Sequence, residues 1–172
     1  GYWQNRVHKF TNNGDLICSW GEGEPVFNQE AWELYRKEDN PNAAGNPGTG
    51  PGEFNLPHDV TVDSNNNVYI MDRENNRCQI FDSDGNFINQ WEDVRGPNDA
   101  VIDDDEVMHI AEGIGSVLIT TLEGEIIGRW GSRGQAPGNF RGFPHGIWID
   151  NQRDIYISEV GTKKGLQKFT RV

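Results

Sequence analysis

Long apolar runs are missing from this chain, and a membrane-spanning helix needs about 18 consecutive apolar residues. Basic residues are scarce as well: 15 Lys and Arg stand against 27 Asp and Glu, which gives a formal net charge of −12. Each phosphate that a protein neutralises needs a lysine or an arginine, so this balance argues against nucleic acid. We therefore expect neither a membrane nor a nucleic acid as partner.

Cysteine is nearly absent. Cys18 and Cys78 fall in successive repeat units, at positions that do not correspond. This favours two isolated strand residues, although the sequence leaves a disulfide open, and with it the redox compartment.

The chain does contain an internal repeat, each unit of which begins at a proline. Residues of the same kind recur at fixed distances from Pro57, Pro97 and Pro144. An aspartate follows after six residues (Asp63, Asp103 and Asp150), and an aromatic residue or histidine after twelve (Tyr69, His109 and Tyr156). An acidic residue follows after fifteen (Asp72, Glu112 and Glu159). The spacing is about 40 to 47 residues, within the range of propeller repeats. Trp20, Trp91 and Trp130 recur at the unit ends, and we expect them to pack between neighbouring units.

Short apolar runs rich in β-branched and aromatic residues lie between these marks, which predicts strands. Clusters of Asp, Asn and Gly, such as 63–67 and 82–86, predict the turns between them. Four such strands in each unit are typical of propeller blades rather than of a sandwich. The sequence therefore predicts an all-β fold, a β-propeller of four-stranded blades.

The repeat also predicts where the blades begin and end. The predicted parts are the end of a blade (1–21), a loop insertion (22–56), two blades (57–92 and 97–131) and an incomplete blade (144–172). Together they make about half of a ring. Because open sheet edges pair with other strands, we expect a homo-oligomer.

The insertion at 22–56 interrupts the repeat. Residues 29–37 predict a short helix, and 40–52 are rich in Pro and Gly, which predicts a loop. Two interpretations stay open: a lid or partner-contact loop at one mouth of the ring, or a surface elaboration that packs Trp32 and Tyr35 on the blade.

The dipeptide Pro-His occurs twice at the same point of the repeat, which singles out His58 and His145. At this point the first strand of a blade begins, so both imidazoles are expected to face a shared axis, with Asn98 at the matching place of the blade between them. A third histidine two blades further round would complete a three-histidine zinc site. A histidine that only caps a turn is the alternative interpretation.

Several longer motifs follow one another in a familiar order. They are residues 1–10 (GYWQNRVHKF), 51–54 with Pro57-His58, 72–77 (DRENNR), 124–127 (GEII) and 143–145 (FPH). In these motifs the chain resembles NHL repeats and, within that group, the propeller of peptidyl-α-hydroxyglycine α-amidating lyase.

That resemblance implies a six-bladed propeller that holds zinc with three histidines, together with a structural calcium. It implies a lyase that splits a peptidyl-α-hydroxyglycine into a peptide amide and glyoxylate, and hence a peptidyl or small carboxylate substrate. His58 and His145 would be zinc ligands, Tyr2 the catalytic base, and Arg73 the arginine that holds the substrate. It also favours an extracellular or periplasmic location, which the sequence itself leaves unknown.

The chain departs from the family's pattern. Gly146 stands where the family has an aspartate after the last zinc histidine, and no residue of the chain matches the family's third histidine. We therefore expect no lyase activity from these residues alone. The alternative function is a non-catalytic propeller that binds a protein or another ligand, with Arg73 as an ordinary ion-pair partner of Asp72 or Glu74.

Overall fold

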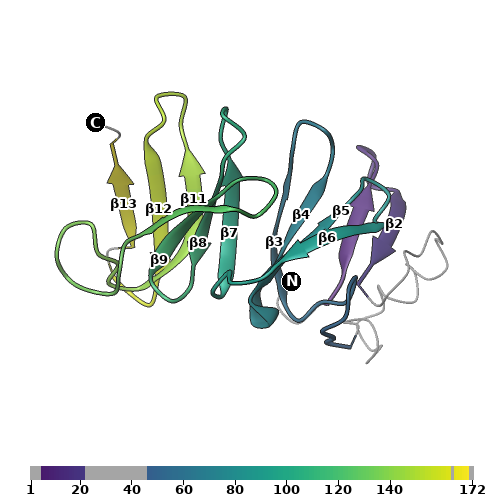
Figure 1. The fold of residues 1–172 in the computed structure, drawn as a ribbon, viewed down its shortest axis with the longest axis horizontal. Coiled ribbons are helices and arrows are strands. Elements are labelled where there is room, and N and C mark those ends of the chain that lie inside the picture. The colour runs from purple at the N-terminus through teal and green to yellow at the C-terminus, as the bar shows by residue number, and fades with distance from the viewer. Residues whose placement is uncertain (1–4, 22–45, 164, 171–172) are drawn as a thin grey trace.

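The computed structural model describes residues 5–21, 46–163 and 165–170. These residues form four antiparallel sheets that stand side by side, from the N-terminal sheet at one end to the C-terminal sheet at the other (Figure 1). The predicted all-β fold of four-stranded blades is confirmed. The predicted helix over 29–37 and the catalytic candidate Tyr2 lie outside the described residues.

The first two sheets contain two and four strands. Their strands are β1 (Val7–Phe10) and β2 (Leu16–Trp20), then β3 (Pro57–Val62), β4 (Val68–Asp72), β5 (Arg77–Phe81) and β6 (Phe87–Trp91). A short 3₁₀ turn, η1 (Arg73–Asn75), links β4 to β5.

The other two sheets contain four and three strands. Their strands are β7 (Pro97–Ile102), β8 (Met108–Glu112), β9 (Ser116–Thr120) and β10 (Ile126–Trp130), then β11 (Phe143–Ile149), β12 (Ile155–Val160) and β13 (Leu166–Phe169). Within each sheet the strands pair in chain order, and the inner strands β3, β7 and β11 are in contact with one another in that order.

The turn that closes the first two strands of each unit depends on the repeated aspartate. Asp63 Oδ1 accepts hydrogen bonds from the backbone N–H groups of Asn65 and Asn67 at 2.9 and 2.8 Å. Asp103 and Asp150 make the same pair of bonds in their own turns. These side chains take the place of backbone acceptors, as aspartate does in tight turns.

The core lies between neighbouring sheets. Trp20 is 2% exposed and packs against Phe54 and Phe81, while Trp91 contributes to the cluster between the second and third sheets. Phe54 and Phe140, at corresponding places in the two long connections, are both fully buried. Cys18 and Cys78 are buried free thiols in two of these sheets, so the interpretation as isolated strand cysteines is confirmed.

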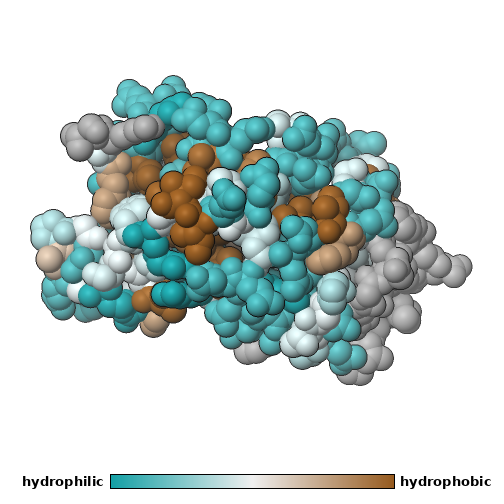
Figure 2. Space-filling view, in the orientation of Figure 1, coloured by the Kyte–Doolittle hydropathy of each residue, from teal (hydrophilic) through white to brown (hydrophobic). Residues whose placement is uncertain are grey.

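On the face shown in Figure 2, apolar atoms gather in separate patches on a mostly hydrophilic surface. Across the described ranges, no helix has the length and apolar character needed to cross a membrane.

Candidate metal and anion site

His58 and His145 lie together although they belong to different blades. Their ring centroids are 4.8 Å apart, with an angle of 81° between the ring planes. His58 is on β3 and His145 on β11, and β7 contacts both strands. The sequence predicted this convergence from the matching repeat positions of the two residues.

A β-bulge at the start of each inner strand helps to aim these side chains. The pairing of β3 with β4 shifts between Pro57 and Asp59, and that of β11 with β12 shifts between Pro144 and Gly146. The residue passed over is a histidine in both strands. A bulge leaves one residue outside the ladder and re-aims its side chain, which is why bulges occur next to functional sites.

The protonation state of His58 follows from its partner. Its Nδ1 lies 2.5 Å from the backbone carbonyl of Asn98. Because a carbonyl can only accept a hydrogen bond, Nδ1 carries the proton and Nε2 holds the lone pair. Burial, together with the positive charge of Arg73, lowers the pKa of His58, and the hydrogen bond to Asn98 only partly opposes this.

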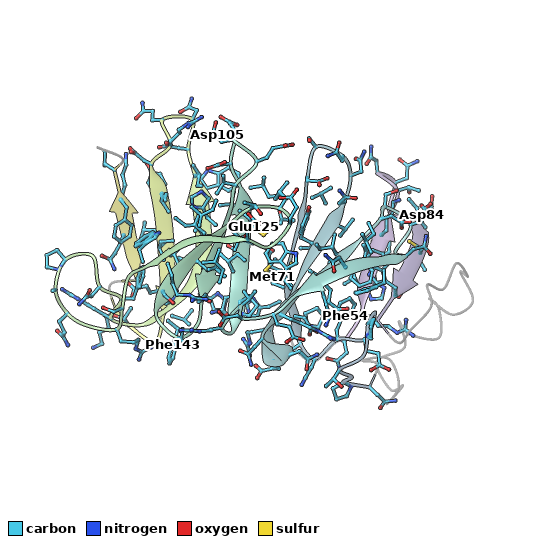
Figure 3. All side chains as sticks on the ribbon, in the orientation of Figure 1. Phe54, Met71, Asp84, Asp105, Glu125 and Phe143 are labelled. Atoms are coloured by element: carbon cyan, nitrogen blue, oxygen red, sulfur yellow. The ribbon has the colours of Figure 1, made fainter. Side chains whose placement is uncertain are left out.

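A pocket of about 330 Å³ adjoins His145, whose ring lies against that of His58. Its lining includes Arg73 from η1, Asn98 from β7 and His145 from β11, with Phe143 and Val160 as an apolar wall. Figure 3 places Phe143 at one end of the blades and Asp105 at the opposite end, so the pocket opens at the end where the inner strands begin.

Arg73, the arginine predicted to hold a substrate, lines this pocket, but it also pairs with its neighbour. Its Nε and Nη2 donate to Glu74 Oε1 at 2.9 and 2.7 Å. The ion pair that the alternative interpretation expected is therefore present, with Glu74 as the partner. The guanidinium side chain is 25% exposed, so an anion that enters the pocket would compete with Glu74 for it.

Two carboxyl groups next to the histidines tie the inner strands together. Asp59 Oδ2 accepts from the backbone N–H of Ala100 at 2.9 Å, and Asp99 Oδ2 accepts from that of Ile147 at 2.7 Å. Burial and the nearby Asp99 carboxyl raise the pKa of Asp59 to about 7. Sequence reasoning missed this pair. Its signal was the aspartate that recurs directly after His58 and Asn98.

The third member of that series is Gly146, and its surroundings leave little room for a side chain. A Cβ on Gly146 would lie 2.6 Å from Ser158 Oγ and 3.5 Å from Asp99 Oδ2. An aspartate at this position would require the Ser158 hydroxyl to turn away and would bring a carboxyl group close to Asp99.

Two imidazoles suit zinc, but they do not make a complete zinc site. Among the described residues there is no group of three or more His, Cys, Asp or Glu side chains that could hold a metal ion. Of the other histidines, His109 binds Asp103 Oδ2 through Nε2 at 3.0 Å, inside the third sheet. The same finding applies to the calcium that the resemblance also implied: the described residues contain no such group of carboxylates.

A larger cavity of about 480 Å³ lies elsewhere. It is lined by Asp103, His109, Trp130 and Phe169 among others, between the last two sheets, and includes none of His58, His145 and Arg73. Size alone would favour it, but the smaller pocket is the one lined by His145 and the Arg73 guanidinium, and His145 lies against His58.

Comparisons with known protein families identify the type of repeat. The family model of the NHL repeat matches residues 54–81, which cover β3, β4 and β5. The chain therefore contains an NHL repeat, and its sheets are arranged as propeller blades.

Relatives and solved structures agree with this class. Human NHL repeat-containing protein 3 is 30% identical over 135 residues, 73% of this chain and 38% of that protein. Virginiamycin B lyase from Staphylococcus aureus matches 96% of this chain with 16% identity and a TM-score of 0.57. A streptogramin B lyase structure matches 97% with 11% identity and a TM-score of 0.56. At such low identity the two lyases show a shared fold only.

The chain is shorter than these proteins. It spans 38% of NHL repeat-containing protein 3 and 48% of each of the two lyase chains.

Proposed function

We propose that this chain is part of a propeller that binds zinc through His58 and His145 and holds a carboxylate ligand at Arg73. The observation that carries the proposal is the 4.8 Å separation of the two imidazole rings. A tetrahedral zinc ion about 2.1 Å from two ring nitrogens places the ring centroids roughly 5 Å apart. The separation of the two rings is therefore the one expected for imidazoles that share one ion.

The tautomer of His58 supports the same proposal. With the Nδ1 proton donated to the Asn98 carbonyl, Nε2 is the nitrogen that can bind a metal. Histidine ligands of metals commonly donate their second ring nitrogen to a carbonyl in this manner.

The second half of the proposal concerns the pocket. Arg73 and His145 line the same 330 Å³ space, and a guanidinium binds a carboxylate through two parallel hydrogen bonds. A small or peptidyl carboxylate is the ligand class that fits, with Phe143 and Val160 providing an apolar wall. Zinc bound at the pair would polarise a ligand oxygen as a Lewis acid.

A more specific proposal is lyase activity of the amidating-lyase type, which would require a complete zinc site. It needs a third zinc ligand beyond His58 and His145, and a base in the role that the resemblance gives to Tyr2. The chain's other two histidines, His8 and His109, lie on β1 and β8, and among the described residues neither forms a group of three metal-binding side chains with His58 and His145. We therefore expect zinc and carboxylate binding, but no turnover, from residues 1–172 alone.

Elemental analysis tests the metal half. Purified protein is loaded with zinc, dialysed, and compared with His58→Ala and His145→Ala; both variants should lose the bound zinc. His109→Tyr is the matched control, because Tyr69 and Tyr156 occupy its repeat position and bind their own turn aspartates in the same way. Equal zinc in the wild type and both alanine variants would refute the proposal and favour the non-catalytic binding propeller.

Carboxylate binding is tested separately, by calorimetric titration with glyoxylate. Arg73→Met should weaken binding, whereas Arg141→Met, an exposed arginine outside the pocket lining, should leave it unchanged. If Arg73→Met binds glyoxylate as the wild type does, Arg73 has no part in ligand binding.

A further inference from the structure

Asn98 occupies the third matching place, between the two histidines. It is the second residue of β7, only 5% exposed, and it too falls at a bulge, because the pairing of β7 with β8 shifts between Pro97 and Asp99. Its side chain is therefore aimed by the same device as the imidazoles of His58 and His145.

The backbone of Asn98 contacts the first histidine. Its carbonyl accepts the Nδ1 proton of His58 at 2.5 Å. This one contact sets both the tautomer and the orientation of the ring. It also links β3 to β7 at the level of the site.

The side chain of Asn98 contacts the strand of the second histidine. Its Nδ2 donates to the carbonyl of Pro144 at 2.7 Å, and Pro144 directly precedes His145. Gly113 lies close to this amide: a Cβ there would stand 3.1 Å from Asn98 Nδ2. The amide is therefore enclosed, and the bond fixes the backbone from which His145 projects.

Neighbouring hydrogen bonds keep these strands in register. The bonds from Ala100 N–H to Asp59 and from Ile147 N–H to Asp99 join the same two pairs of strands one position further along. They fix the spacing of the strands, but neither touches an imidazole or the residue before one. Asn98 alone among these groups contacts His58 directly and the peptide that precedes His145.

We propose that Asn98 is the positioning residue of the histidine pair, holding His58 through its carbonyl and His145 through its amide so that both rings face one metal ion. This inference rests on the proposed zinc site, which it deepens. In this role Asn98 acts through its backbone carbonyl and through its Nδ2 donor, which is engaged with Pro144.

Zinc affinity, measured by competition with a chelator, is the first test. Asn98→Asp keeps the shape but replaces the donor with an acceptor that repels the Pro144 carbonyl, and Asn98→Ala removes the group. Each should weaken zinc binding about 10- to 100-fold, the usual effect of losing such a supporting contact. Asn75→Ala is the control, since it also loses an amide-to-carbonyl bond, to Gly48 at 2.8 Å, away from the pair. Asn98 variants that keep wild-type affinity, or lose no more than Asn75→Ala, would overturn the proposal.

Nitrogen-15 NMR of the metal-free protein is the second test, and it does not require zinc. The wild type should show His58 as the Nδ1–H tautomer and a nuclear Overhauser effect between the His58 and His145 rings. Asn98→Ala should lose the cross-ring effect and the single tautomer, while Asn75→Ala keeps both. If the wild type binds no zinc, the proposed function fails, and the NMR result still decides the role of Asn98: unchanged ring signals in Asn98→Ala would refute it.

Discussion

The indole of Trp91 lies against Gly124 of the next blade, so closely that a Cβ on the glycine would stand 2.6 Å from the indole Cγ. Trp20 meets Gly85 in the same manner, at 2.8 Å. Both glycines have positive φ angles, 91° for Gly124 and 86° for Gly85. The same tryptophan–glycine contact therefore recurs between successive blades. It requires a residue that has no Cβ and that adopts a positive φ angle, and glycine meets both conditions.

Gly124→Ala should therefore destabilise the protein by about 2–5 kcal/mol. A left-handed backbone costs an L residue about 1–2 kcal/mol, and overpacking against Trp91 adds about 1–3 kcal/mol. Urea unfolding followed by tryptophan fluorescence measures the free energy.

The control for this prediction is Gly14→Ala. Gly14 has a φ angle of 89° and nothing within 4 Å of a built Cβ, so it retains the backbone cost without the clash. Gly14→Ala should lose only about 1–2 kcal/mol. Equal losses in the two variants would show that the tryptophan contact contributes nothing.

Arg77 supports a buried carboxylate. Its Nε donates to Asp72 Oδ2 at 2.7 Å, with side-chain exposures of 5% and 0%. Its Nη groups donate to the carbonyls of Thr49, Gly50 and Glu53, so it also anchors the end of the long connection to the blade. Arg77→Ala leaves Asp72 as an uncompensated buried charge and should cost about 3–5 kcal/mol in unfolding free energy.

An exposed pair provides the comparison. Arg95 Nε lies 3.3 Å from Asp93 Oδ1, and the two side chains are 50% and 56% exposed. Arg95→Ala should change stability by less than about 1 kcal/mol, as is usual for surface ion pairs. If Arg77→Ala and Arg95→Ala unfold at the same urea concentration, the buried ion pair contributes no more to the free energy of unfolding than the exposed one.

The repeat made much of this molecule predictable from sequence. The same residue types recur at the same distances from the repeated prolines. These spacings predicted the strands and the convergence of His58 and His145. Arg73 lies in η1, the turn after the second strand of its blade. These features depend on position within a unit, which one sequence records.

The contacts between blades were not predictable in the same way. The hydrogen bonds of Asn98 depend on the bulge in β7 and on the relation of β7 to its two neighbours, which no short motif encodes. Asn98 was recognised as the matching residue, but nothing in its identity showed that its carbonyl and amide would serve different strands. The Asp59–Asp99 pair was missed for the same reason.

Stability in acid should depend on the turn aspartates. Burial of Asp63 opposes its ionisation, but hydrogen bonds from Asn67, Asn65 and Tyr69 outweigh this and hold the pKa below its ordinary value. As the pH falls, the unfolded chain, with a pKa of about 3.9, takes up the proton first. The stability that Asp63 contributes is therefore present above about pH 4 and is lost below it, as the pH falls through the folded-state pKa.

Asp63→Asn should make this acid transition shallower. The amide keeps an acceptor for the turn but no longer titrates, so the urea midpoint should fall less between neutral pH and about pH 3. Asp104→Asn, at an exposed position in the next unit's turn, is the control and should follow the wild-type curve. If the urea midpoint of Asp63→Asn falls in acid as much as that of the wild type, the loss of stability in acid does not come from Asp63.

Self-association is the last prediction, and it concerns apolar surface on the inner strands. Trp148 on β11 is 66% exposed, and Val60 and Val62 on β3 are each 52% exposed. Exposed apolar surface can mark an interface with another chain. We therefore expect a homo-oligomer, with Trp148→Glu shifting the protein toward monomer in sedimentation velocity over a concentration series. Ile88→Glu, at a 52% exposed position on β6, is the matched control and should leave the mass unchanged. A wild-type protein that sediments as a folded monomer at every concentration would refute the expectation.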